Sequence, residues 1–376
     1  MHTIIDARMI LPYQTGVGRY LTGLAQGLSE LSTGDQFEFW IQQDLPPNHP
    51  IRTFAGGNLN LREIPYRHMD VRSFWRIPIE ITHRKPDLLH YPHFDLPWSV
   101  PGRIVATLHD LKYIVQAARF PRNHKLKRLV IYSMMYFTAH RSKRIIAVSK
   151  RTGEDIQNYL NISPDKISVI HLGIDVRFFQ PASPYDVSHL SKHYGLEKPY
   201  LLFVGERRPH KNLPTLIKAF SIFMKSAAQS YLLVIAGRSY AYYQEPEKLV
   251  EALGLEDSVR FLDYVPDNDL PLLYRGASAF ISLSEYEGFG LPALEAMASQ
   301  TPVVVSNNTS FPEVVGTAGI TIAPNDVEQA ALALQKVIPG GEKREECILR
   351  GVQRAQNFTW QQCAEKTLSV YHQAVS

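Results

Sequence analysis

The stretch from residue 284 to residue 313, SEYEGFGLPALEAMASQTPVVVSNNTSFPE, constrains the fold more than any other part of the chain. It reads as a polar loop, a short helix predicted over 292–299, and then a buried strand. Gly288 and Gly290 let backbone N–H groups approach a ligand closely, because they have no side chain. Pro292 suits the first turn of a helix, where its missing N–H is not needed. The free N–H groups of that helix predict an anion site suited to a phosphate.

Two acidic residues flank this predicted anion site. Glu287 precedes the glycines and Glu295 lies in the helix, eight positions later (295 − 287 = 8). A carboxylate only accepts hydrogen bonds, so beside a phosphate these side chains suit neutral hydroxyl groups better than the anion itself. Sugar and ribose hydroxyls therefore fit the pattern. The alternative is a surface loop followed by an amphipathic helix with two solvated acids.

The same stretch resembles the signature of family 4 glycosyltransferases, two glutamates separated by seven residues, and EGFGLPALEA matches it closely. Members of that family are retaining nucleotide-sugar enzymes of the GT-B fold, with two Rossmann-like, doubly wound parallel-sheet α/β domains that face each other across a cleft. The resemblance implies that Glu287 contacts hydroxyls of the transferred sugar and that Glu295 holds the ribose. It also implies that backbone N–H groups cradle the sugar and phosphate, those of Gly288, Phe289, Gly290 and Leu291.

Size and charge are those of an ordinary globular protein. The chain has 376 residues, which suits two domains better than one core, and 45% of them are hydrophobic. The 40 basic residues are nearly balanced by 36 acidic ones, so the net charge of +4 does not indicate a nucleic-acid partner. Cys347 and Cys363 are too few for a disulfide scaffold and have no metal-ligand spacing, which favours a reducing cytoplasm.

The N-terminal segment does not read as a targeting sequence. Asp6 and Arg8 interrupt its short apolar run, which excludes a signal peptide. The sequence also has no uninterrupted apolar stretch of the ~18 to 20 residues that a membrane-spanning helix needs. We therefore expect a cytoplasmic protein, either soluble or peripheral at the cytoplasmic membrane face.

Short hydrophobic segments that end in polar turns alternate with helical segments along most of the chain. This alternation is typical of parallel sheets covered by helices, in which ligands gather at the carboxyl ends of the strands. The composition becomes polar and irregular at residues 181–199, which predicts a hinge between an acceptor-side domain (1–180) and a donor-binding domain (200–357). By the family resemblance, a final helix (358–376) crosses back to the first domain.

In the first domain, two glycines and one histidine are the candidate site residues. Gly16 and Gly18 lie in a loop before a predicted helix, but Leu21 stands where a dinucleotide-binding fingerprint needs a third glycine. The resemblance implies that this loop, TGVGRY, faces the donor phosphates; Arg19 either helps to hold an anion or is simply solvated. His109 follows a predicted strand, and the resemblance implies that it reaches the donor sugar. A purely structural histidine is the alternative.

In the second domain, basic residues crowd one turn after the strand YLLFV. Arg207, Arg208, His210 and Lys211 repel one another there, and a bound diphosphate would relieve that repulsion. The resemblance implies that an arginine and a lysine hold the donor diphosphate, and Arg207 and Lys211 match those positions. Many relatives have the arginine where this chain has Glu206, so Arg208 remains an alternative to Arg207.

A later turn of the second domain holds two further candidates. By resemblance, Val265 lies against the nucleobase. The run Asp267-Asn268-Asp269 resembles a metal-binding Asp-x-Asp motif of a different glycosyltransferase fold, but we expect it to cap the helix that begins at Leu270. We therefore expect no metal site and no cofactor besides the nucleotide-sugar substrate.

The segment 125–144 is apolar in its middle and basic at both ends. We expect a buried helix of the domain with solvated ends, and the alternative is docking on an anionic membrane surface. Just beyond it, Ser149 is expected to cap the next helix.

Taken with the resemblance, these residues predict transfer of a hexose, glucose or mannose, from a UDP- or GDP-sugar with retention of configuration. The acceptor would be a hydroxyl of a carbohydrate or lipid-linked acceptor in polysaccharide, glycolipid or lipid-linked oligosaccharide synthesis. Arg207, Lys211 and the helix amides would oppose the charge that develops on the departing diphosphate. One alternative is a nucleotide-sugar epimerase or a phosphorylase on the same fold. Another is a non-catalytic component of a polysaccharide assembly that binds sugar nucleotides.

Overall fold

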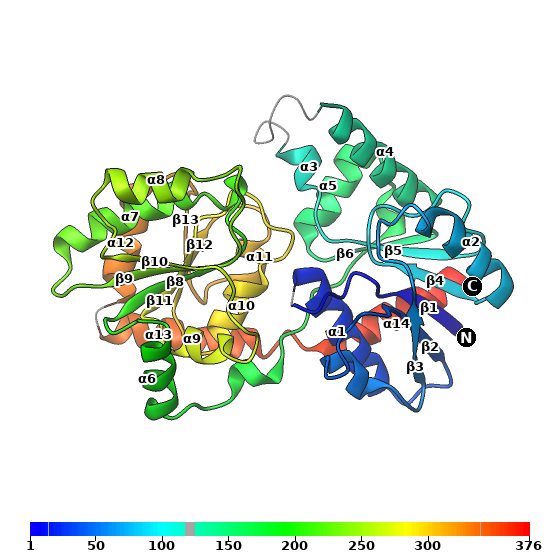
Figure 1. Ribbon diagram of the computed structural model, residues 1–376, viewed down its shortest axis with the longest axis horizontal. Coiled ribbons are helices and arrows are strands. Elements are labelled where there is room, and N and C mark those ends of the chain that lie inside the picture. Colours follow the sequence, from blue (N-terminus) through cyan, green and yellow to red (C-terminus); the bar gives the residue numbers. More distant parts are fainter. Residues whose placement is uncertain (14, 117–124, 339) are drawn as a thin grey trace. The chain divides into compact units, whose positions relative to one another are not determined.

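The computed structural model describes residues 1–13, 15–116, 125–338 and 340–376, with only the backbone of residue 125 (Figure 1). The chain divides into two compact units. Unit 1 comprises Met1–Gly173 and Phe358–Ser376, and unit 2 comprises Ile174–Asn357. Residues 174–199, which the sequence assigns to the end of the first domain and to a hinge, thus belong to unit 2.

Unit 1 is built on a sheet of seven parallel strands in the order β3-β2-β1-β4-β5-β6-β7. The strands are β1 (His2–Asp6), β2 (Gln36–Gln42), β3 (Leu59–Ile64), β4 (Leu88–Tyr91), β5 (Ile104–Leu108), β6 (Arg144–Ala147) and β7 (Ile167–Val169). Thr3 of β1 pairs with Phe37 on one side and with Leu88 on the other. The sheet therefore extends from β1 in both directions, with β2 and β3 on one side and β4 to β7 on the other. All carboxyl ends lie along one edge, where a doubly wound sheet binds ligands.

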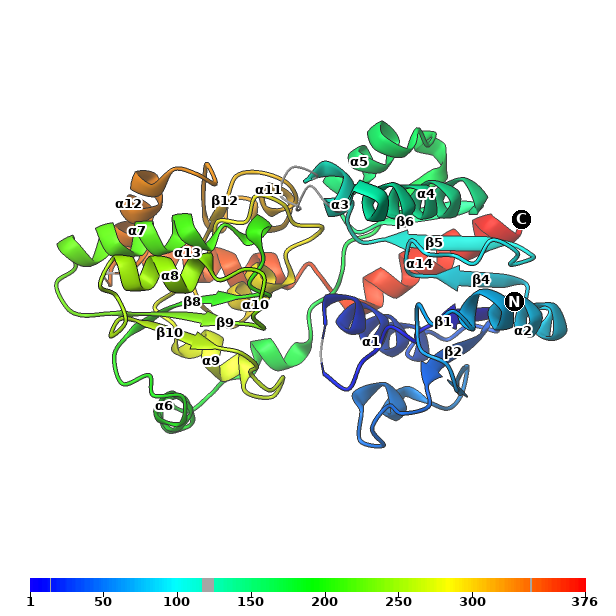
Figure 2. The same cartoon turned by 45° about the horizontal axis from the view of Figure 1, so that its top comes forward.

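The helices of unit 1 connect these strands. They are α1 (Gly16–Ser29), α2 (Ser73–Arg84), α3 (Lys112–Val115), α4 (Lys125–Arg141), α5 (Lys150–Leu160) and α14 (Trp360–Val375), with 3-10 helices η1 (Pro50–Phe54) and η4 (Pro164–Lys166). The C-terminal helix α14 lies against α1 (Figure 2). Their contact is close because Gly23 of α1 faces the ring of Trp360, and a Cβ atom at Gly23 would lie 2.1 Å from that ring. Ser149 caps α5 by accepting a hydrogen bond from the Thr152 amide, as expected.

Unit 2 repeats the architecture with six parallel strands in the order β10-β9-β8-β11-β12-β13. The strands are β8 (Tyr200–Val204), β9 (Leu232–Ala236), β10 (Val259–Leu262), β11 (Ala279–Ser282), β12 (Val303–Ser306) and β13 (Ile320–Ile322). β9, β11 and β12 are buried along their whole length. This burial explains why they read as continuous apolar runs, since helices cover both faces of such a sheet.

The helices of unit 2 complete its layers. They are α6 (Pro184–His193), α7 (Leu213–Ser226), α8 (Glu245–Ala252), α9 (Leu270–Gly276), α10 (Leu291–Ala298), α11 (Phe311–Val315), α12 (Val327–Val337) and α13 (Glu342–Ala355), with 3-10 helices η5 (Val176–Phe179) and η6 (Pro209–Lys211). Helix α6 lies in the segment expected to be irregular. Ser183 and Asp186 form a capping box at its start, and Pro184 opens its first turn.

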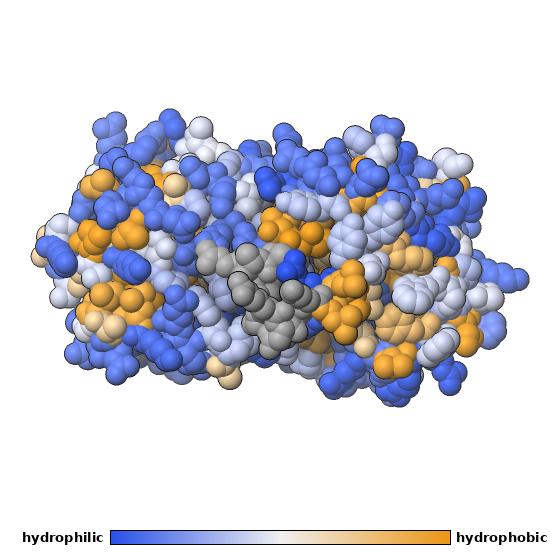
Figure 3. All heavy atoms as spheres, turned by 90° about the horizontal axis from the view of Figure 1, so that it is seen from above, coloured by the Kyte–Doolittle hydropathy of each residue, from blue (hydrophilic) through white to orange (hydrophobic). Residues whose placement is uncertain are grey.

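Helix α4 has one buried face and one exposed face. Its buried side chains include Ile131 and Met135, which pack in a hydrophobic cluster with residues of β5 and β6. Its other face exposes Leu126, Leu129 and Val130, and apolar side chains lie among hydrophilic ones on this side of the molecule (Figure 3). Within the described part of the chain, no helix is both long and apolar enough to span a membrane. Contact of α4 with an anionic membrane stays a prediction.

Candidate active site

The carboxyl edge of the sheet in unit 2 brings together two residues that the sequence singled out. Lys211 ends η6, directly after β8, and Glu287 lies in the loop after β11. The Lys211 Nζ atom and the Glu287 Oε1 atom are 2.6 Å apart, and their side chains are only 15% and 16% exposed. The amide of Glu285 donates to the carbonyl of His210 at 2.8 Å, which joins the two loops through their backbones. The ion pair is therefore held by a fixed frame.

The last residue of β12 and the polar turn after it support the Glu287 loop. Their side chains make four hydrogen bonds with the backbone of residues 284–287: Ser306 Oγ to Ser284 O (2.6 Å), Asn308 Nδ2 to Glu285 O (2.8 Å), Glu287 N to Thr309 Oγ1 (3.3 Å) and Ser310 Oγ to Glu287 O (3.1 Å). None of these four residues was predicted from the sequence. They could have been predicted from the cluster of Ser, Asn and Thr at the end of a buried strand, because such side chains hydrogen-bond to nearby backbone groups.

Helix α10 begins directly after the glycine loop. Gly290 is its N-terminal flanking residue and has φ +103°, a conformation that favours glycine. A Cβ atom there would lie 2.8 Å from the ring of Phe311, so both the backbone conformation and the space select glycine. The helix starts at Leu291, one residue before the predicted start, and no side chain caps it. Its first N–H groups are thus arranged as an anion site would require.

Glu295 lies in α10 and is almost completely buried, with 1% of its surface exposed. Its Oε2 atom accepts a hydrogen bond of 2.9 Å from the hydroxyl of Tyr274, which comes from α9. Tyr274 is itself fixed, because its carbonyl accepts a bond from Thr301 Oγ1. The carboxylate is therefore oriented by the protein, and its contact with a ribose stays a prediction.

The two candidate arginines do not join Lys211. Arg207 is 4% exposed; its guanidinium pairs with Asp263 and, at 3.6 Å, with Glu247, and it lies over the ring of Phe261. Arg208 pairs with Glu206 at 2.6 Å and donates to the hydroxyl of Tyr240 at 2.7 Å.

Each of the three cations of this turn has its own acidic partner, so the crowding expected from the sequence is dispersed. Burial opposes the charge of Arg208, but Glu206 and Tyr240 outweigh it and raise the pKa of the guanidinium. Asp263, Glu247 and Glu206 were missed as partners. Only Glu206 is near in sequence, since Asp263 follows Arg207 by 56 positions.

The turn after β10 corrects one expectation. Asp269 precedes α9 but makes no capping hydrogen bond, so the predicted cap is wrong. Its carboxylate instead accepts a bond of 2.6 Å from Tyr194, while Asp267 pairs with Arg177 at 2.7 Å. These acids thus join segments of unit 2 through one hydrogen bond and one ion pair. Val265, the candidate for contact with a base, is buried in the same turn.

In unit 1, His109 follows β5 at the carboxyl edge of the sheet, as expected. Its ring packs edge-on against Tyr20 with centroids 4.9 Å apart, and it donates a hydrogen bond to the carbonyl of Pro92. Its Nε2 atom is buried without a hydrogen-bond partner among the described residues. Burial first, and then the nearby His93, lower the pKa of His109 to about 4, so the imidazole is neutral at pH 7.

The glycines near the start of unit 1 are helical rather than in a loop. Gly16 is the first residue of α1, and the Gly18 amide donates to Thr15 Oγ1 at 3.0 Å. Thr15 therefore caps the helix, and this use of the Gly18 N–H competes with any donor phosphate. The threonine cap was readable from the sequence, since threonine is a preferred residue before a helix.

Two family models match the two halves of the chain. One is described as Glycosyltransferase Family 4 and matches residues 14–178, and the other is described as Glycosyl transferases group 1 and matches residues 189–354. Among curated proteins, the chain is 33% identical to O-antigen chain mannosyltransferase B of Escherichia coli, over 76% of this chain and 74% of that protein.

Solved structures share the fold. The Anabaena protein Alr3699/HepE, crystallised with UDP and glucose, has a TM-score of 0.77 at 17% identity, covering 99% of this chain and 100% of that one. WaaG, a glycosyltransferase involved in lipopolysaccharide biosynthesis, has a TM-score of 0.76 at 17% identity, covering 99% of each chain. Together with the two doubly wound sheets, these similarities confirm the GT-B fold.

Proposed function

Because the chain belongs to the group 1 glycosyltransferases of family 4, we propose that it transfers mannose from GDP-mannose to a hydroxyl of a growing polysaccharide or glycolipid. Mannose is chosen over glucose because O-antigen mannosyltransferases of two organisms are among the similar proteins. UDP-glucose is the competing donor, since a structural relative was crystallised with UDP and glucose.

The Lys211–Glu287 pair beside the start of α10 supports this proposal most strongly. Cleavage of the bond between sugar and diphosphate leaves negative charge on the diphosphate. A lysine and helix N–H groups that are already oriented stabilise such charge without rearranging during the reaction. In our proposal the diphosphate replaces Glu287 as the partner of Lys211, and Glu287 turns to the hydroxyls of the sugar.

We assign no protein nucleophile. Glu287 is the acidic candidate nearest to the proposed sugar, and its ion pair with Lys211 suits positioning rather than attack. Retention would then follow from attack on the same side as the leaving group, with a diphosphate oxygen accepting the proton of the acceptor hydroxyl. We expect no metal ion in this step, because Lys211 and the amides of α10 would compensate the negative charge of the diphosphate.

The test is donor consumption by the purified chain with GDP-mannose or UDP-glucose, each with and without mannose-terminated oligosaccharides. We expect release of GDP that increases when acceptor is added, and a product whose anomeric configuration, measured by NMR, matches that of the donor. Conversion of the donor sugar without acceptor would instead identify an epimerase. Tight binding of donor with no turnover on any acceptor would identify a non-catalytic binder.

A further inference from the structure

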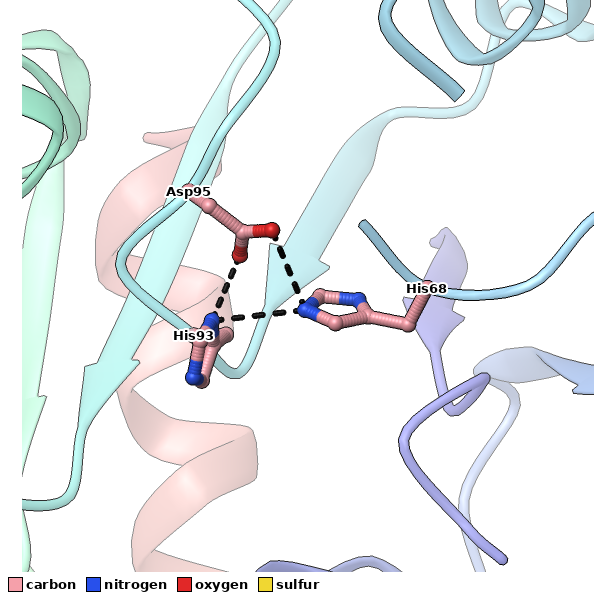
Figure 4. Close-up of side chains that lie close together, drawn as sticks. All are labelled: His68, His93 and Asp95. Carbon is pink, nitrogen blue, oxygen red and sulfur yellow. Dashed lines mark hydrogen bonds and ion pairs between the residues drawn. The ribbon is translucent and has the colours of Figure 1, made fainter. Parts of the chain in front are cut away.

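Three side chains of unit 1 that play no part in the proposed transfer converge on one point. His68 Nε2 lies 3.1 Å from Asp95 Oδ2 and 3.3 Å from His93 Nδ1, and His93 Nδ1 lies 2.5 Å from Asp95 Oδ1. Figure 4 shows His68 approaching from one side, with His93 and Asp95 opposite it on a shared loop. Nitrogen and carboxylate ligand atoms thus face a common centre.

The position of this cluster suits a ligand site. His68 follows β3, and His93 and Asp95 follow β4, so all three lie beyond carboxyl ends of the parallel sheet. β2 and β1 lie between those two strands in the sheet, so the loops meet above them. Ligands of doubly wound sheets bind at this edge. His68 and Asp95 are 27 positions apart in the sequence (95 − 68 = 27), so no short motif indicated the cluster.

The electrostatics of the cluster favour a cation. Asp95 is 2% exposed, and a buried carboxylate needs a compensating charge or a metal ion. Arg8, a buried arginine of the same unit, is already paired with another carboxylate. Its Nε and Nη2 atoms bind the two oxygens of Asp6 at 2.9 Å and 2.7 Å, and Nη1 donates to Ser73 Oγ. The Asp95 carboxylate instead contacts the two imidazoles and, at 3.5 Å, the hydroxyl of Tyr91, so its cationic or protonatable partners among the described residues are histidines.

We propose that His68 Nε2, His93 Nδ1 and Asp95 Oδ2 bind a divalent transition-metal ion of the Zn²⁺ class. Zinc–nitrogen bonds of about 2.0–2.1 Å place tetrahedral ligands about 3.3 Å from one another. The separations of His68 Nε2 from its two partners, 3.3 Å and 3.1 Å, match such edges. Imidazole with carboxylate also suits this class of metal better than it suits Mg²⁺ or Ca²⁺, which prefer oxygen.

Two features set the character of the site. Three protein ligands leave a fourth position for water or a hydroxyl group, as in zinc sites that exchange ligands. His68 and His93 are 10% and 16% exposed, so solvent reaches this side of the cluster. His68 Nδ1 is buried without a hydrogen-bond partner among the described residues, and such outer partners normally strengthen binding. We therefore expect an exchangeable ion rather than one that survives purification with chelator.

A bound ion would have a structural role in unit 1. It would fix the loop that holds His93 and Asp95, and that same loop supplies the Pro92 carbonyl to which His109 donates. The inference does not depend on the proposed function, because it concerns binding of a metal and not turnover.

The experiment uses the full chain, freed of metal by dialysis against chelator and then titrated with Co²⁺ and Zn²⁺. We expect one Co²⁺ per chain with the intense visible absorption of a tetrahedral site, displaced by Zn²⁺, and a rise in the melting temperature with Zn²⁺. His93→Ala and Asp95→Asn should each weaken binding by at least ~100-fold, since loss of a mere outer partner already costs ~10- to 100-fold.

His140→Ala is the matched control, because His140 is an exposed histidine of the same unit on α4. It should leave the Co²⁺ spectrum and affinity unchanged. Absence of stoichiometric, tetrahedral Co²⁺ binding in the wild-type chain would overturn the proposal even where a variant fails to fold. So would unchanged Co²⁺ affinity in folded Asp95→Asn, because the ion would then be bound without the Asp95 carboxylate.

Discussion

The two parallel sheets of this protein have the same topology around their first strands, yet the side chains at their carboxyl edges differ. In unit 2 the edge holds separate pairs of opposite charge, Lys211 with Glu287 and Arg208 with Glu206. In unit 1 it holds the buried carboxylate of Asp95 and an ion pair of Arg8 with Asp6, together with histidines that follow the strands, His68, His93 and His109. A lysine or arginine whose acidic partner can be replaced by a phosphate suits the binding of an anionic donor. Imidazole rings suit hydroxyl groups or a metal ion. One fold thus presents two different kinds of site.

The largest effect that this comparison predicts is at Lys211. Lys211→Ala should lower turnover by roughly 100-fold or more, the scale expected when a charge-stabilising group is lost at the reacting centre. Lys218→Ala is the control, because Lys218 is exposed on α7 in the same unit. Steady-state kinetics with saturating donor measure the effect. Near-normal turnover of Lys211→Ala would exclude this lysine from the diphosphate site.

The next effect is on nucleotide binding at Glu295. Glu295→Gln should weaken binding of the bare nucleoside diphosphate by roughly 10-fold or more, because a hydrogen bond to a charged acceptor is worth ~1.5–3 kcal/mol. Calorimetric titration measures the affinity, with exposed Glu342→Gln as control. If the affinity does not change, Glu295 serves only to hold Tyr274 and the ribose role is refuted.

Acid should weaken unit 1 through His90, which is fully buried between the hydroxyls of Tyr371 (2.6 Å) and Thr107 (2.8 Å). Burial lowers its pKa to about 3, below the ordinary value of 6.5, so the unfolded chain binds this proton more tightly. The contribution to stability is complete above pH 6.5 and is lost as the pH falls toward 3. Through His90 alone, the free energy of unfolding should change by at most about 1.4 kcal/mol per pH unit.

Urea unfolding at several pH values tests this, with hydrogen exchange to follow the amides of unit 1. His90→Gln should show a flatter dependence of unfolding free energy on pH than the wild type, whereas exposed His140→Gln should not. Parallel pH curves for wild type and His90→Gln would show that His90 titrates normally in the folded protein.

The smallest effect is expected at Asp267. Asp267→Asn removes an ion pair with the partly exposed Arg177, so the loss of stability should be ~1 kcal/mol or less. Nucleotide affinity should be the same with and without chelator in both wild type and variant. A fall in affinity with chelator that added metal restores, and that is absent from the variant, would return these acids to a metal-binding role.

Patterns local in sequence predicted much of this structure. The alternation of apolar strands with polar turns indicated the doubly wound sheets, and Ser149 was recognised as a cap. A local signal was also overlooked, since Ser183 and Asp186 have the spacing of a capping box and begin α6. The glycines and glutamates around α10 were informative because backbone conformation and helix ends depend on neighbouring residues.

Partners that are distant in sequence were not predictable. Asp269 was expected to cap α9, but its carboxylate accepts a hydrogen bond from Tyr194, 75 positions away. Arg207 was matched to a phosphate-binding position, but the fold places Asp263 beside it. The choice among competing partners depends on which loops the sheet brings together. For the same reason the His68–Asp95 cluster is visible only in three dimensions.

The central claim is that unit 2 holds the donor diphosphate at Lys211 and the first amides of α10. A crystal structure of the chain with a nucleoside diphosphate sugar tests it most directly. We expect diphosphate oxygens within hydrogen-bond distance of Lys211 Nζ and of the backbone at residues 288–291, with the Lys211–Glu287 pair opened. A donor bound elsewhere, with that ion pair still closed at its present 2.6 Å, would contradict the claim.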